Sequence, residues 1–344
     1  MKSGNKSVHA SHSVGKAQLW SNLPPYGWKT VFWIIVVFVF LSISGRHSEI
    51  DKLIALTGEA GGYLIGVRED SQVVEGSGRI LTSMFPPQIS EITEISRIEN
   101  FDEKNLPFLS RIETERVSVT ELSPKTLELI QSDTTRRVLY NPIGYLVHVF
   151  KKMLETIEMA IWATMFAIFL SIPLAYLSSA NYSPNRVVYS TARAVVSFLR
   201  ALPELISAMF LVLAFGFGPI AGILALAFHA AGFLGKFYAE DIESADVGPQ
   251  KALKAIGLSK IKILRFAVLP NVLPQYVAYN MYILDRNVRM ATVVGIVGAG
   301  GIGQELKGRY DMFDYGHVTT ILLVIFITVF ALDQLSSWIR AKII

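Results

Sequence analysis

The chain has no cysteine, little charge and no P-loop. Without a cysteine among its 344 residues, it can form neither a disulfide framework nor a thiolate-ligated metal site. Only 17% of the residues are charged and 51% are hydrophobic, a composition too apolar for an ordinary soluble domain. The pattern G-x-x-x-x-G-K-[ST] does not occur, so the chain does not bind and hydrolyse ATP through a P-loop of its own. The composition predicts a polytopic membrane protein.

Residue constellations for enzymatic chemistry are also missing. The six histidines lack the clustering of a metal site, because only His9 and His12 lie close together in the sequence, and no cysteine or acidic residue is near these two. His229 falls inside an apolar run, where a hydrogen-bonded core histidine is the favoured interpretation. We therefore expect no catalytic residue, no metal and no cofactor in this chain.

Charge is distributed unevenly along the chain. Residues 1–29 contain four lysines and no acidic residue, whereas residues 46–147 contain 16 acidic and 11 basic residues, a net charge of −5. All residues outside 46–147, those of 1–29 included, carry 21 basic and 12 acidic residues, a net charge of +9. By the positive-inside rule, we expect a cytoplasmic tail (1–29), a transmembrane anchor (30–45) and an extracytoplasmic, periplasmic insertion (46–147). A cleaved signal peptide remains an alternative for the anchor.

The insertion contains a glycine-rich part and alternating stretches such as 111–119, whose period of two is typical of a strand. A small extramembrane α+β insertion is the expected fold. It could receive a partner protein or simply cover one side of the membrane bundle, and the sequence leaves both open.

Apolar runs of membrane length follow the insertion. Together with the anchor they predict an all-α membrane bundle of about six transmembrane helices. The five further runs are 153–177, 187–215, 219–238, 267–299 and 317–339.

Five charged residues lie inside these runs: Arg200, Glu204, Asp285, Arg286 and Arg289. An arginine at the centre of a membrane helix costs on the order of 3 kcal/mol, so each should face the bundle interior. One interpretation is that these residues and Thr292 line the pathway of a small anion. The other is structural pairing at i, i+4, which joins Arg200 to Glu204 and Asp285 to Arg289 and leaves Arg286 over.

A glycine cluster ends the fourth of these runs. Its members are Gly295, Gly298, Gly300, Gly301 and Gly303. Three of them fit G-x-G-x-x-G, but no acidic residue follows at the distance a dinucleotide site requires, and both flanks are membrane runs. We expect close helix packing or a flexible gate loop instead.

A basic amphipathic segment, 240–266, interrupts the apolar runs. Gly248 as N-cap and Pro249 as first residue predict a short helix that closes at Gly257. One face of that helix should then be apolar, with Ala252 and Ala255. The polar and basic side chains should point away from it; they are Gln250, Lys251 and Lys254. Such a helix is suited to docking a partner.

The same segment carries a family resemblance. Ala252, Gly257 and the pair Leu269-Pro270 have the spacing of the cytoplasmic EAA loop of ABC-importer permeases, with Lys251, Leu253 and Ala267 as departures from that pattern. The stretches FLRALPEL at 198–205 and DRNVRMATVVGIVGAGGIG at 285–303 resemble the phosphonate-type subfamily. The resemblance covers roughly 148–340 and implies a permease domain at 148–344, with five helices similar to the type I importer core.

The resemblance implies a function and partners. It implies a permease subunit in a bacterial inner membrane that imports phosphonate, phosphite or hypophosphite. Its partners would be two ABC ATPase subunits that bind ATP and magnesium, a periplasmic solute-binding protein, and a second permease copy or a paralogue, all within a lipid bilayer and without nucleic acid. The 249–257 helix would be the coupling helix. The alternative is an ion-gradient-driven secondary transporter for a small anion, which should show internal repeats; none is visible.

The charge distribution yields a test of topology. A cysteine introduced at Ser90 of this cysteine-free chain should react with a membrane-impermeant maleimide in intact cells, because 46–147 is expected outside. A cysteine at Ser259 should stay unlabelled until the membrane is permeabilised. Labelling of Ser259 with protection of Ser90 would invert the orientation and remove the coupling assignment.

Overall fold

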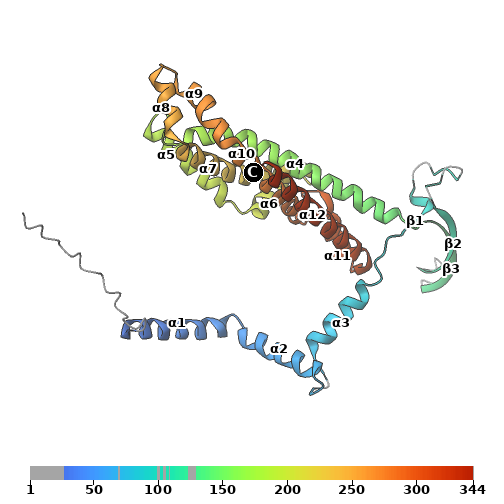
Figure 1. The fold of residues 1–344 in the computed structure, drawn as a ribbon. Helices are drawn as coiled ribbons and strands as arrows, with labels where there is room; N and C mark the ends of the chain where they lie inside the picture. The colour runs from blue at the N-terminus through green and yellow to red at the C-terminus, as the bar shows by residue number, and fades with distance from the viewer. Residues whose placement is uncertain are drawn as a thin grey trace, which may run out of the picture. The chain divides into compact units, whose positions relative to one another are not determined.

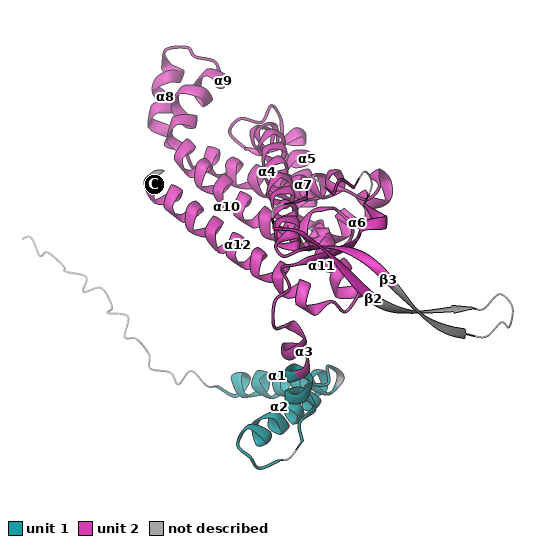
Figure 2. Cartoon of the chain, turned by 90° about the vertical axis from the view of Figure 1, so that its right-hand side faces the viewer, with its two compact units in different colours: residues 1–78 teal, residues 79–344 magenta. Residues whose placement is uncertain are grey.

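A computed structural model describes residues 27–68, 70–98, 101–103, 106–107, 109–122 and 129–343. It divides into two compact units, residues 1–78 and residues 79–344 (Figure 2). The expected cytoplasmic tail lies almost wholly outside the described residues, which begin at Gly27.

The first unit is helical. It contains α1 (Trp28–His47), α2 (Ile50–Leu64) and the start of α3 (Gln72–Met84), which spans the boundary between the units. The expected anchor is part of α1, whose apolar window has a mean hydropathy of 1.9 and no buried residue. A helix that is apolar on every side is typical of a membrane span, so α1 fits the predicted anchor.

The second unit contains a small antiparallel sheet. Its strands β1 (Glu91–Glu94), β2 (Arg111–Leu122) and β3 (Leu129–Asn141) lie in the order β1-β3-β2, and a 3₁₀ turn, η1 (Ile95–Arg97), follows β1. In register, Arg111 faces Tyr140 and Leu122 faces Leu129. The strand predicted from the alternation at 111–119 is confirmed, and so is a small α+β insertion.

A helical bundle forms the rest of the second unit (Figure 1). Its long helices are α4 (Gly144–Ser178), α5 (Arg186–Ala201), α6 (Glu204–Phe215), α7 (Pro219–Ser244), α10 (Leu269–Gly295) and α12 (Tyr315–Ile343). Its short helices are α8 (Val247–Ala255), α9 (Lys260–Ile263), the π-helical turn η2 (Leu264–Val268) and α11 (Gly301–Asp311). Small residues of α4 and α7, such as Ala163 and Ala230, are fully buried, which allows close helix packing.

The number of apolar spans is lower than expected from the sequence. Within the described residues, α1, α4, α7 and α12 are long and apolar enough to cross a membrane, and the bent pair α5–α6 makes a fifth if it is one span. The run 267–299, predicted as a further span, corresponds mainly to α10, which is not among them. Polar and charged side chains interrupt α10, and it packs against α4, α7 and α12.

Two glycines let α11 approach α10. A Cβ on Gly303 would overlap the carbonyl oxygen of Thr292, and a Cβ on Gly295 would lie 2.6 Å from the carbonyl oxygen of Gly300. The close packing expected for this part of the glycine cluster is confirmed.

We therefore expect Gly303→Ala to destabilise the α10–α11 contact, by about 1–3 kcal/mol on the scale of overpacked cores. Gly308→Ala is the matched control, because Gly308 lies in the same helix with nothing within 4 Å of its added Cβ. Thermal unfolding of the purified protein should show a lower midpoint for Gly303→Ala and an unchanged or higher one for the control. Equal midpoints would contradict the packing argument.

Candidate functional site

The predicted span 187–215 is broken into two helices. α5 ends at Ala201 and α6 starts at Glu204, with a bend of 90° between them. Pro203 lacks an amide hydrogen and disfavours a helical conformation at Leu202, so the helix stops there. The predicted i, i+4 pair of Arg200 and Glu204 is therefore wrong, since these residues lie on different helices and Glu204 pairs with Arg286 instead.

Glu204, Arg286 and His229 form a buried cluster at this break. The Glu204 carboxylate lies 2.8 Å from Nη2 of Arg286, and the same nitrogen lies 2.9 Å from Nε2 of His229. Nδ1 of His229 lies 3.0 Å from the carbonyl oxygen of Leu202, which can only accept a hydrogen bond. The proton therefore resides on Nδ1, and Nε2 accepts from Arg286.

His229 thus satisfies the carbonyl that the helix break leaves free. The expected hydrogen-bonded core histidine is confirmed, since His229 is 8% exposed and both ring nitrogens have partners. Its contact with Arg286 was missed, because nothing in the sequence spacing links residues 229 and 286.

Two guanidinium groups lie against one aromatic ring of α7. The guanidinium carbons of Arg200 and Arg286 lie 4.9 and 5.0 Å from the ring centroid of Phe233. Gly232 makes this approach possible, because a Cβ there would lie 2.9 Å from the backbone nitrogen of Arg200 and from Cβ of Leu199. The positive charges are thereby held at the break.

This cluster contains hydrogen-bonding capacity that the protein does not use. Nε of Arg200 and Nη1 of Arg286 are buried without a hydrogen-bond partner. Oε1 of Glu204 also lacks a well-directed hydrogen bond, although it lies at ion-pair distance from Arg286. With His229 neutral, two cations face one carboxylate, so the cluster is net positive.

The remaining predicted pathway residues lie on α10. Asp285 pairs with Arg289 at 2.7 Å, which confirms that i, i+4 pair. The Arg289 side chain is 46% exposed, whereas that of Asp285 is 6% exposed. An open groove of about 440 Å³ is lined by Arg289, Thr292, Leu322, Ile325, Phe326 and Val329. An arginine is costly against lipid, so this side of α10 requires water or another protein surface.

The glycine-rich loop after α10 joins several helices. Its residues Gly298, Gly300 and Gly301 have φ of 91°, 85° and 69°, which favour glycine. The Gly218 amide donates to the Gly298 carbonyl at 3.0 Å, and the Gly301 amide donates to the Glu155 carboxylate at 3.1 Å. The loop therefore holds the α6–α7 turn and α4 to the start of α11.

The predicted docking helix is α8, but its start differs from the prediction. It begins at Val247, and the Asp246 side chain accepts from the Gly248 amide at 2.9 Å. The predicted N-cap at Gly248 is therefore wrong, because an aspartate two residues earlier provides the acceptor.

The predicted end of this helix is confirmed. Gly257 has a φ of 86°, its amide donates to the Lys254 carbonyl at 3.0 Å, and the Leu258 amide donates to the Leu253 carbonyl at 3.2 Å. These two bonds form a Schellman motif, which requires a left-handed residue at Gly257.

The surface of α8 has an apolar part and a basic part. Ala252, Ala255, Lys251 and Lys254 are all exposed. Gln250 instead accepts from the Tyr182 hydroxyl at 2.9 Å and donates to the Ala245 carbonyl at 3.1 Å, so its side chain anchors α8 to the bundle.

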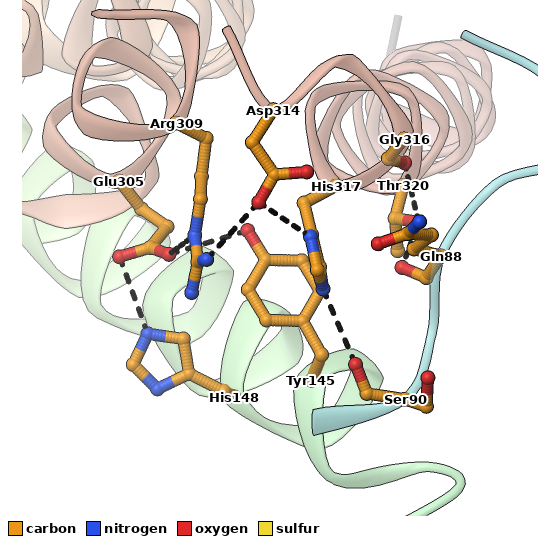
Figure 3. A network of polar contacts seen from close by, with 10 residues as sticks. All are labelled: Gln88, Ser90, Tyr145, His148, Glu305, Arg309, Asp314, Gly316, His317 and Thr320. Carbon is orange, nitrogen blue, oxygen red and sulfur yellow. Dashed lines mark hydrogen bonds and ion pairs between the residues drawn. The ribbon is translucent and has the colours of Figure 1, made fainter. Parts of the chain in front are cut away.

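A second polar network, missed by the sequence analysis, links α4, α11 and α12 (Figure 3). Glu305 lies 3.0 Å from Nε of Arg309 and 3.4 Å from His148, and Arg309 also contacts Asp314 at 3.2 Å. Asp314 in turn lies 2.7 Å from His317. Burial favours the neutral carboxyls, but hydrogen bonds and nearby positive charges outweigh it and lower the pKa of Glu305 and of Asp314.

The segment before β1 is fastened to this network. The backbone of Ser90 lies within hydrogen-bond distance of His317, at 3.2 Å, and the Thr320 hydroxyl donates to the Gln88 carbonyl at 2.6 Å (Figure 3). The Gln88 amide donates to the Gly316 carbonyl at 3.1 Å. These contacts fix the segment before β1 to α12 within the second unit.

Known proteins resemble this chain in sequence. Residues 143–343 match the family described as binding-protein-dependent transport system inner membrane component. HtxE of Stutzerimonas stutzeri, named as a phosphite transport system permease protein, is 56% identical over 261 residues, which cover 76% of this chain and 100% of HtxE. The phosphate-import permease protein PhnE of Mycolicibacterium smegmatis is 40% identical over 210 residues, covering 61% of this chain and 40% of PhnE.

A solved structure resembles this chain in fold. An inward-facing conformation of the MetNI methionine ABC transporter matches with a TM-score of 0.51 and 22% identity, and the match covers 57% of this chain and 96% of that chain. At this identity the likeness concerns the fold alone.

We expect Arg309→Met to destabilise the fold, because it removes the cation that Glu305 and Asp314 share. The cost should be about 1–2 kcal/mol, below the 3–5 kcal/mol of fully buried pairs, because both carboxylates are partly exposed. Lys307→Met is the control, since it breaks only the exposed pair with Asp311. Thermal midpoints at pH 7 measure both effects.

The pH dependence has a defined sign. Because the folded-state pKa values of Glu305 and Asp314 are lowered, their stabilisation is present above the ordinary carboxyl pKa of about 4 and is lost as pH falls through the lowered values. The difference between Arg309→Met and the wild type should therefore shrink in acid. If Arg309→Met and Lys307→Met lowered the thermal midpoint equally at pH 7, the stabilising role of the network would be contradicted.

Proposed function

The chain belongs to the family of binding-protein-dependent transport system inner membrane components, as the resemblance in its sequence predicted, and on that premise we propose the substrate and the partners of this permease. We propose that it imports a small phosphorus oxyanion, with phosphite the leading candidate. The observation that supports this choice is the 56% identity to HtxE along the whole of HtxE. Phosphonate and hypophosphite are further candidates of the same chemistry.

The helix break supplies suitable chemistry for such an anion. Planar guanidinium groups match the oxygens of phosphorus oxyanions, and Arg200 and Arg286 retain unused buried donors. The amino terminus of α6 adds a partial positive charge where the helix restarts. Broken membrane helices whose amino termini face an anion are a recurring arrangement in transporters.

The proposed assembly contains two permeases, two ABC ATPase subunits and a periplasmic solute-binding protein in a bacterial inner membrane. ATP and magnesium would be bound by the ATPase chains. A second permease copy would lie opposite the face of α10 on which Arg289 is exposed, together with Thr292, and the two copies would enclose a water-filled path between them. Residues 46–147 would lie on the periplasmic side, as their net charge predicts.

The proposed coupling surface is α8. Its exposed alanines allow close contact with a groove of the ATPase, and Lys251 and Lys254 favour acidic residues on that partner. The Schellman motif at Gly257 fixes where α8 ends and so maintains this surface.

Reconstitution tests the proposed function. In proteoliposomes containing the permease, its ATPase and its solute-binding protein, phosphite should stimulate ATP hydrolysis and should accumulate inside. The substrate assignment would be refuted if no phosphorus oxyanion stimulated ATP hydrolysis while a solute of another class did.

Ala255→Asp should abolish this stimulation while leaving the permease in the membrane. A carboxylate buried without a partner in a docking groove costs several kcal/mol, more than so small a contact can supply. Ala255→Ser is the matched control, because it changes the same position without adding charge and should retain most of the stimulation. Full stimulation in Ala255→Asp would remove α8 from the coupling surface.

A further inference from the structure

We propose that Glu204 is an internal counter-anion of the translocation site. Its carboxylate occupies Arg286 in the conformation described here, and the transported oxyanion replaces it on Arg286 during translocation. The inference rests on the proposed function and assigns Glu204 a role in regulating that site.

The Glu204 carboxylate lies where a transported anion would bind. It is the first residue of α6, where the positive end of the helix favours a negative charge. Its carboxylate is the acidic partner of Arg286 among the ion pairs of the described residues, at 2.8 Å. A carboxylate and a phosphorus oxyanion both present two oxygens to a guanidinium group, so they compete for the same donors.

The cluster has an excess of positive charge and unpaired hydrogen-bond donors that can bind an incoming anion. Arg200 and Arg286 together carry two positive charges against the one negative charge of Glu204. Their guanidinium carbons can lie at most 9.9 Å apart, because they lie 4.9 and 5.0 Å from the same ring centroid of Phe233. Nε of Arg200 and Nη1 of Arg286 have no hydrogen-bond partner, so donors for the anion remain on both arginines.

Exchange requires that neither Arg286 nor Glu204 is left without a partner. When the anion takes Arg286, the carboxylate can accept from the unpaired first-turn amides of α6, which begins at that residue. Arg286 also donates to Nε2 of His229, and because this hydrogen bond does not involve Glu204 it can persist after the exchange. The buried charges thus stay compensated throughout.

A purely structural ion pair would behave differently. In that case Glu204→Gln leaves Arg286 as an uncompensated buried charge, and the permease should be lost from the membrane. For an internal counter-anion, Glu204→Gln removes a competitor while the oxyanion itself can neutralise Arg286. The permease should then remain in the membrane and bind the anion more tightly.

Equilibrium binding of radiolabelled phosphite to the purified permease–ATPase complex, without the solute-binding protein, separates these possibilities. We expect Glu204→Gln to lower the dissociation constant for phosphite about tenfold, which corresponds to about 1.4 kcal/mol of binding free energy. The amount of the variant in the membrane should equal that of the wild type. The gain should disappear in the double variant Glu204→Gln/Arg286→Gln. Glu240→Gln is the control, because it neutralises an exposed glutamate of α7 and should not change binding.

Two outcomes would overturn the proposal. One is unchanged phosphite binding in Glu204→Gln. The other is loss of Glu204→Gln from the membrane with rescue by the second substitution, which identifies a structural pair. Both differ from failure of the proposed function, in which the wild-type importer itself takes up no phosphorus oxyanion in the presence of its solute-binding protein.

Discussion

The hydrocarbon interior of a membrane does not tolerate an uncompensated charge, and this constraint determines the centre of the bundle. Arg286 of α10 is compensated by Glu204 of α6 and by His229 of α7. His229 in turn satisfies the carbonyl at the end of α5. One polar cluster therefore joins four helices and stabilises a 90° break that would otherwise expose free backbone groups.

α10 connects this cluster to both ends of the helical bundle. It continues from α9 and η2, next to the proposed coupling helix, and it leads into the glycine-rich loop that holds α4 and the α6–α7 turn. Arg286 lies within this long helix. A displacement of α8 by an ATPase would therefore act on the helix that carries the proposed anion-binding arginine, which is how coupling and translocation can be linked.

The sequence predicted the helical bundle, the small α+β insertion, the end of α8 at Gly257 and the Asp285–Arg289 pair, because each depends on local patterns. The partner of Arg286 could not be predicted, since Pro203 turns α6 away from α5 and brings Glu204 to a residue 82 positions later. The contacts of His229 and the network around Arg309 also join distant segments. Asp246 was missed as N-cap because Pro249, which suits the first helical position, pointed to Gly248 as the residue before the helix.

In the assembled importer, the charged side of α10 should face an aqueous anion path. A single cysteine at Thr292 in this cysteine-free chain measures this directly through its rate of reaction with a small water-soluble methanethiosulfonate. We expect a fast reaction in the reconstituted complex that slows when phosphite and its loaded solute-binding protein are supplied with ATP. A cysteine that stays unreactive in a fully active transporter would contradict it.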